Sequence, residues 1–240
     1  MAGVVKVFHS WRCVSDAVVA ALSEPTTDPF VRPILVAPGN AQSRSLLQSL
    51  ARRHGIAAGI DTTTPLGLRE RLEEDLLGVK RENDPWQPGS LALRICRVIE
   101  NNSPGFEVVS AHLEASRRQG VPRATWTTAR QAADAICALA RDSHDVLNAW
   151  ADGAAPTSHQ GDTDLAGDPL DPARAWWAPL WRTLLAEPCH VPDPVSRHQL
   201  LVDAILTQSR SEPPIVWFSS TTTAQHDVSL AEALSASHDV

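Results

Sequence analysis

Several features are scarce or missing in this sequence, and each absence excludes a class of protein. The 240 residues contain four cysteines, Cys13, Cys96, Cys137 and Cys189, and no two of them form a CxxC pair. Cysteines spaced so widely predict neither a zinc site nor a disulfide framework, so a reducing cytoplasm fits them best. A charged segment followed by an apolar leader is absent, and no apolar run approaches the ~20 residues that cross a bilayer. Neither secretion nor membrane insertion is expected.

Excess positive charge is also missing. The chain has 28 acidic and 21 basic residues, which gives a net charge of -7. Proteins that hold nucleic acid by bulk attraction need clustered lysine and arginine to neutralise phosphates. Any contact with DNA must therefore be local.

The sequence offers no pattern typical of a catalytic or metal centre. Its nine histidines are scattered, whereas a metal site needs ligands that converge. A G-x-S-x-G elbow is absent, and the serines of "FSSTTT" have no neighbouring base. No catalytic, cofactor-binding or metal-binding residue is predicted.

The beginning of the chain has the pattern of a nucleotide-binding fold without its phosphate loop. Residues 4–8, "VVKVF", are typical of a buried strand, and a helical pattern follows directly. In nucleotide-binding α/β folds, a glycine-rich loop with a lysine joins two such elements and holds phosphates. The junction here, "HSWRCVSD", has neither glycine nor lysine.

Hydrophobic periodicity predicts an α/β protein with a large helical insertion. The apolar run "PILVAP" at 33–38 predicts a second strand, and Leu46, Leu47 and Leu50 lie on one face of the helix that follows it. Strand patterns then disappear until Ile215–Phe218. We expect a parallel α/β domain from residues 1–64 and 212–240, incomplete at its C-terminal end, with an all-helical subdomain over 65–211.

Two further segments of the helical part have distinctive compositions. Residues 151–172 are rich in Gly, Pro, Asp and Ser and predict a flexible acidic loop. Asp193 and Pro194 are typical of a helix N-cap and first helical position. Because the last helical pattern ends where a further strand could begin, we expect this sequence to be the front part of a longer protein.

The order of these segments resembles two related families. A helical insertion within a nucleotide-type domain resembles the first motor domain of superfamily I helicases, so the expected fold is a partial, P-loop-like parallel sheet. More specifically, the chain resembles the N-terminal region of the RecC family, the gamma subunit of exodeoxyribonuclease V in the RecBCD complex. The motifs are "VFHSWR", "DPFVRPILVAPGNAQSRSLLQSLARRHGIAAGID", "AADAICAL" and "ARAWWAPLWRTLLAE", in the family order.

The resemblance implies a subunit that does not hydrolyse ATP. RecC proteins form a channel for single-stranded DNA and hold RecB and RecD, the motors that bind ATP and magnesium. The missing phosphate loop agrees with this, and Ser219 and Ser220 follow the last strand where a motor would present acidic residues to magnesium. The implied partners are RecB-like and RecD-like subunits, single-stranded DNA and duplex DNA ends, in double-strand break repair. The family also reads the Chi sequence, but Thr64 and Glu70 replace apolar and aromatic channel positions.

The resemblance also points to DNA-contacting residues, each with a structural alternative. Asn40, Gln42 and Arg44 stand where helicases contact single-stranded DNA, although the same residues are typical of a capped helix start. The family often has an aromatic residue at the position of Ser45. Asp134 and Arg197 match channel positions, and both are also ordinary for solvent-exposed helix surfaces.

Trp176, Trp177 and Trp181 allow two interpretations. They could form a base-stacking stripe, but their helical spacing favours core packing. For the whole chain, two rival functions remain open: a stand-alone enzyme with a divergent nucleotide site, or a protein-interaction module outside any enzyme complex.

Overall fold

The structure, a computed structural model, describes residues 10–23, 30–101, 105–153, 176–207, 213–219 and 224–237. The chain divides into two units. The first unit comprises residues 1–80 and 200–240, and the second comprises residues 81–199. The boundaries expected from the sequence, at 64 and 212, stay a prediction.

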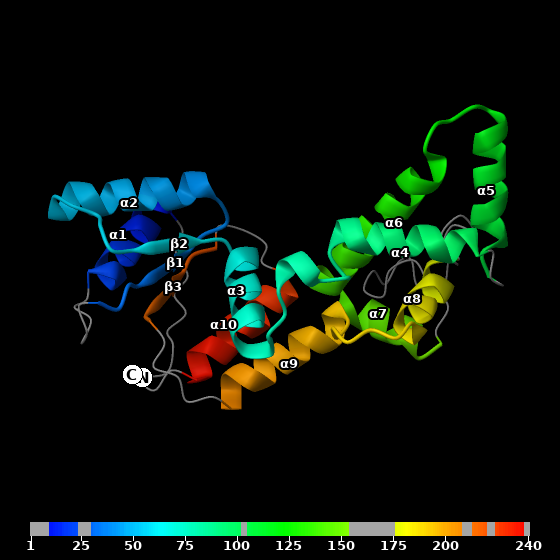
Figure 1. Ribbon diagram of the computed structural model, residues 1–240. Helices are drawn as coiled ribbons and strands as arrows, with labels where there is room; N and C mark the ends of the chain where they lie inside the picture. Colours follow the sequence, from blue (N-terminus) through cyan, green and yellow to red (C-terminus); the bar gives the residue numbers. More distant parts are fainter. Residues whose placement is uncertain are drawn as a thin grey trace, which may run out of the picture. The chain divides into compact units, whose positions relative to one another are not determined.

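The first unit is built around a small parallel sheet (Figure 1). Strand β1 (Ile34–Val36) lies between β2 (Asp61–Thr63) and β3 (Ile215–Trp217), and both pairs are parallel. Ile34 pairs with Asp61 on one side and Ile215 on the other. Because both edges of β1 are hydrogen-bonded and its side chains are apolar, the strand is buried along its whole length.

Alternate residues of β1 contact helices on opposite faces of the sheet, as the two-residue period of a strand requires. Leu35 packs in one core cluster with α1 (Trp11–Leu22) and α2 (Asn40–His54). Ile34 and Val36 pack in the other cluster with α3 (Pro65–Leu77), α9 (Pro194–Thr207) and α10 (Gln225–Ser237). Figure 1 shows α1 and α2 on one side of the strands and α3 and α10 on the other.

Local sequence signals determine where several helices begin and end. Ser10 accepts a hydrogen bond from the N–H of Cys13 at the start of α1. Thr64 does the same for Gly67, with Pro65 in the first helical position of α3. That helix ends at Gly78, whose φ of 68° suits a residue without Cβ.

The second unit is helical, and the elements form one apolar core. Its largest fully buried side chain is Trp181 of α8, and α4 and α6 pack against each other along that core. None of the helices among the described residues is long and apolar enough to cross a membrane. The elements of this unit are the 3-10 helix η1 (Arg81–Asn83), α4 (Pro88–Glu100), α5 (Glu107–Arg118), α6 (Ala124–Asp142), α7 (His144–Ala151) and α8 (Trp177–Ala186).

The predicted fold class, a superfamily I helicase-like sheet domain, is wrong. The described residues form one sheet with three strands of three residues each, and helices dominate the rest. The prediction inferred a large sheet from short apolar runs. In the structure, the largest core cluster is instead formed by packing between helices. The predicted large helical part is present in the structure. The expected strand at 4–8 lies outside the described residues.

Candidate DNA-contacting residues and a buried polar network

Three of the predicted DNA-contacting residues lie together at the beginning of α2. Asn40 and Arg44 are exposed and one helical turn apart, so they share a face. Gln42 is half-buried, and its Oε1 would lie 3.2 Å from a Cβ at position 39, so this amide lies against Gly39. The helix start therefore presents an amide and a guanidinium outward.

The electrostatics of this helix start favour an anion. The N-cap residue, Gly39, has no side chain to cap the helix, and the first turn contains no acidic residue. The N–H groups of that turn carry the positive end of the helix dipole. No ion pair joins Arg44 to any other residue that the structure describes.

The strand topology places the same residues where open parallel sheets present ligand-binding loops. Strand β1 is central, and the chain leaves its carboxyl end to enter α2. The β1–α2 connection leads to β2 on one side of β1, whereas β3 pairs on the other side. Such a reversal marks the usual binding position in these sheets. The donors there are suited to an anion such as a phosphate.

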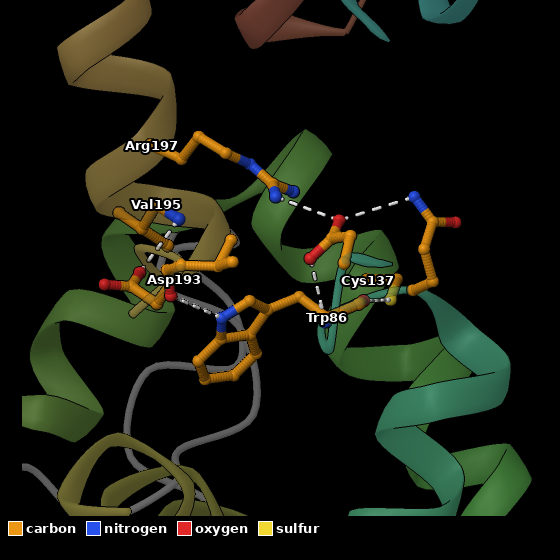
Figure 2. A network of polar contacts seen from close by, with 8 residues as sticks. Trp86, Cys137, Asp193, Val195 and Arg197 are labelled. Atoms are coloured by element: carbon orange, nitrogen blue, oxygen red, sulfur yellow. Dashed lines mark hydrogen bonds and ion pairs between the residues drawn. The ribbon is translucent and has the colours of Figure 1, made fainter. Parts of the chain in front are cut away.

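Arg197, a predicted channel residue, forms a buried ion pair within this chain. Its Nη1 donates to Oδ2 of Asp84 at 2.9 Å, and the two side chains are 9% and 2% exposed. The other oxygen, Oδ1, accepts from the N–H of Trp86 at 2.9 Å. Figure 2 shows Arg197 extending from α9 toward the segment with Trp86. Asp84 thus joins α9 to the segment before α4.

Trp86 anchors the same network through both its ring and its backbone (Figure 2). Its indole N–H donates to the carbonyl of Val191 at 3.2 Å, and the carbonyl of Trp86 accepts from the thiol of Cys137 at 3.6 Å. The guanidinium of Arg94 lies 4.4 Å from the ring centroid, a cation–π distance. Asp193 caps α9 through the N–H groups of Val195 and Ser196, which confirms the predicted N-cap.

Cys137 is held in its neutral form by this environment. Burial, followed by the negative charges of Asp134 and Asp84, raises its pKa to about 11. A thiolate is the nucleophilic form of cysteine. At neutral pH the side chain is therefore a packed thiol and not a reactive one.

Asp134, the remaining predicted site residue, lies on the exposed side of α6. It accepts from Arg130 at 3.0 Å, one turn earlier on the same helix. Exposed pairs of this kind contribute little to stability. The structure thus brings Asn40, Gln42 and Arg44 together, while Asp134 and Arg197 each have a partner in the second unit. Their roles toward DNA stay predictions.

The tryptophans are core residues, as their spacing favoured. Trp176 and Trp181 are 4% and 1% exposed, and Trp177 packs against the same cluster.

Sequence reasoning missed Asp84. An Asp before Pro85 signals a turn, but nothing local indicates a partner 113 residues away. Among the described residues, no three His, Cys, Asp or Glu side chains gather as a metal site.

Comparisons with known proteins agree with one another. The family model described as "RecC, N-terminal domain" matches residues 8–240. A relative from Mycobacterium tuberculosis (strain H37Rv), named RecBCD enzyme subunit RecC, is 30% identical over 251 residues, covering 95% of this chain and 20% of the relative. The same subunit from Mycolicibacterium smegmatis is 27% identical over 239 residues, covering 95% and 19%. The chain spans about a fifth of the length of these curated relatives.

Proposed function

The chain belongs to the RecC family, and from this premise we propose that it is part of a non-catalytic subunit of an ATP-dependent exodeoxyribonuclease and helicase complex. The complex would act on duplex ends in double-strand break repair by homologous recombination. The names of the relatives, RecBCD enzyme subunit RecC, support this assignment. RecB-like and RecD-like subunits are the proposed partners, and they would bind the ATP and magnesium.

Within that complex, we propose that the start of α2 guides single-stranded DNA. The observation that supports this role is the exposed pair Asn40 and Arg44 at the carboxyl end of the central strand, on a helix start without an acidic residue. In a chain with a net charge of -7, a cation at that position that forms no ion pair with the described residues favours a local phosphate contact. Ser45 offers no ring for base stacking, so the contact would be to the backbone.

Reading of a Chi-like sequence is a finer proposal, and two residues bear on it. Thr64 caps α3 by accepting from the N–H of Gly67 at 3.1 Å, so its hydroxyl already has a structural role. Glu70, also on α3, adds negative charge. A channel with these residues would distinguish bases through polar contacts rather than through the apolar and aromatic contacts of the family.

The experiment replaces Arg44 in the assembled complex. Arg44→Ala should leave thermal stability within about 0.5 kcal/mol, as expected for an exposed residue. Single-strand binding should weaken, and the slope of log affinity against log salt should fall by about 0.7 if one phosphate contact is lost. Binding is measured by fluorescence anisotropy over a salt series.

Arg53→Ala is the matched control, because Arg53 is also an exposed arginine and lies in the last turn of the same helix. It removes the same charge about 13 Å away along α2. If both variants change the salt slope equally, the α2 start is not a specific contact. If Arg44→Ala melts several degrees lower with an unchanged slope, Arg44 is a structural residue.

A further inference from the structure

A second concentration of positive charge lies in the second unit, between α5 and α6. Between Glu114 and Asp134 the chain has four arginines and no acidic residue. Three of them, Arg117, Arg118 and Arg123, are exposed and lie in or beside the connection between the helices. Residues 117–126 are called the basic turn below. Its charge is opposite to the net charge of -7 of the whole chain.

The basic turn has a defined backbone. Gly120 has a φ of 70°, and its N–H donates to the carbonyl of Arg117 at 3.0 Å. The N–H of Val121 donates to the carbonyl of Ser116, also at 3.0 Å. These two bonds define a Schellman motif, which ends α5 sharply. The arginines are thus presented from a fixed turn and not from a flexible linker.

Arg123 occupies a backbone conformation that disfavours its side chain. Its φ is 58°, and it is the one described residue other than glycine with a positive φ. A side chain in this region is less favourable than glycine, because its Cβ crowds the backbone. Arg123 also makes no side-chain cap to α6, although it is the N-cap residue. The exposed Arg123 side chain thus does not contribute to the start of α6 as a cap.

Apolar side chains are exposed beside these charges. Val121 is 47% exposed and Trp126, in the first turn of α6, is 39% exposed. In a Schellman motif, the residue at the position of Val121 often makes an apolar contact with the last turn of the helix, but here nearly half of its side chain stays exposed. Exposed aromatic rings together with basic residues are the combination that proteins use to bind unpaired nucleic-acid strands, since bases stack on the ring.

A solvated helix surface is the simplest alternative, and the pairing of the charges argues against it. Arg118 has a 3.5 Å contact with Glu114, but both side chains are more than half exposed, so the pair is weak. No ion pair joins Arg117 or Arg123 to another residue in the part of the chain that the structure describes. Like charges brought together on a fixed turn repel one another until a polyanion neutralises them.

We propose that the basic turn is a second contact for an unpaired DNA strand, in which Arg117, Arg118 and Arg123 bind successive phosphates and Trp126 stacks on a base. This contact is independent of the one at Arg44, which lies on α2 in the first unit. Charge complementarity favours a polyanion as the ligand. The exposed indole favours a single strand over a duplex, because unpaired bases can stack on it.

The test measures binding of the full chain to a labelled single-stranded oligonucleotide by anisotropy, over a salt series. Arg123→Gly removes the guanidinium and relieves the unfavourable φ, so binding should weaken while the melting temperature stays equal or rises. The triple variant Arg117→Ala, Arg118→Ala, Arg123→Gly should lower the salt slope by about 2, for three phosphate contacts. Trp126→Leu should weaken single-strand binding roughly 5- to 150-fold, the range for one stacked base.

Arg141→Ala is the charge-matched control, since Arg141 is an exposed arginine in the last turn of the same helix, α6. It should leave the salt slope unchanged. Equal binding by the wild type and the triple variant would overturn the proposal. So would equal affinity for duplex DNA of the same sequence, or for polyglutamate. An Arg44→Ala chain measured alongside separates the two sites: if it weakens binding while the triple variant does not, only the basic turn is refuted.

Discussion

Asp84→Ala is the substitution whose effect the structure constrains most closely. The change leaves the guanidinium of Arg197 in a site where its side chain is 9% exposed, and it removes the acceptor for the N–H of Trp86. Breaking a buried ion pair from one side costs about 3–5 kcal/mol, because the remaining charge loses its partner without regaining water. For a chain of this size, each kcal/mol lowers the melting temperature by about 2–4 °C. The melting temperature should therefore fall by about 6–20 °C.

A double-mutant cycle separates the charge pair from the backbone contact. Asp84→Asn keeps an oxygen for the Trp86 N–H but loses the charge, so it should cost less than Asp84→Ala. Arg197→Met removes the cation and keeps a similar length of apolar chain. If the pair is coupled, the double variant Asp84→Asn, Arg197→Met should be more stable than the sum of the single effects by about 0.5–3 kcal/mol.

Thermal unfolding followed by far-UV circular dichroism, together with single-strand binding, would settle the role of Arg197. A loss below about 1 kcal/mol for Asp84→Ala, or strict additivity in the cycle, would refute the buried-pair argument. If Arg197→Met keeps its stability and instead lowers the salt slope of DNA binding, the earlier interpretation of Arg197 as a channel residue is right.

Two further predictions concern groups that the proposed function does not use. Because burial raises the pKa of Cys137 to about 11, only about one molecule in a thousand carries the Cys137 thiolate at pH 8. A maleimide should therefore label the exposed Cys13 and Cys189 first. The labelling rate of Cys137 should rise about tenfold per pH unit. Mass spectrometry of the labelled peptides gives the rates, and equal labelling of Cys137 at pH 8 would contradict its burial. The chain itself should give no saturable heat in calorimetry with millimolar ATP and magnesium. The reason is that the "HSWRCVSD" junction has no glycine or lysine to hold phosphates. A saturable signal would favour the alternative function of a stand-alone enzyme.

The sequence predicts local structure well where the signal is local. The run at 33–38 contains β1, the run at 215–218 contains β3, and Asp193 caps α9, since apolar continuity and capping depend on neighbouring residues. Strand β2 was missed, because "DTT" is polar and is held mainly by its pairing with β1. The helicase-like sheet failed for a related reason. Strand number and length depend on pairing between distant segments, and periodicity does not report that pairing.

The candidate site shows the same division between local and distant information. Residues 40–44 are brought together by one helix start, so the sequence could group them. Asp84 could not be found because its burial depends on Arg197, far along the chain. The basic turn was not predicted from the sequence, because its exposure and the positive φ of Arg123 appear only in three dimensions.

The pairing of β1 with β3 also affects how the protein is made on the ribosome. Ile34 and Ile215 are neighbours in the sheet but about 180 residues apart in the chain. At a synthesis rate of about 5–20 residues per second, β1 waits about 10–35 s for that partner to be made. During this time its apolar side chains and one row of backbone groups are open to other strands, including those of nascent neighbours. The helices of the second unit are made within the same interval. Slowed translation after β1 should therefore increase aggregation more than slowed translation after β3.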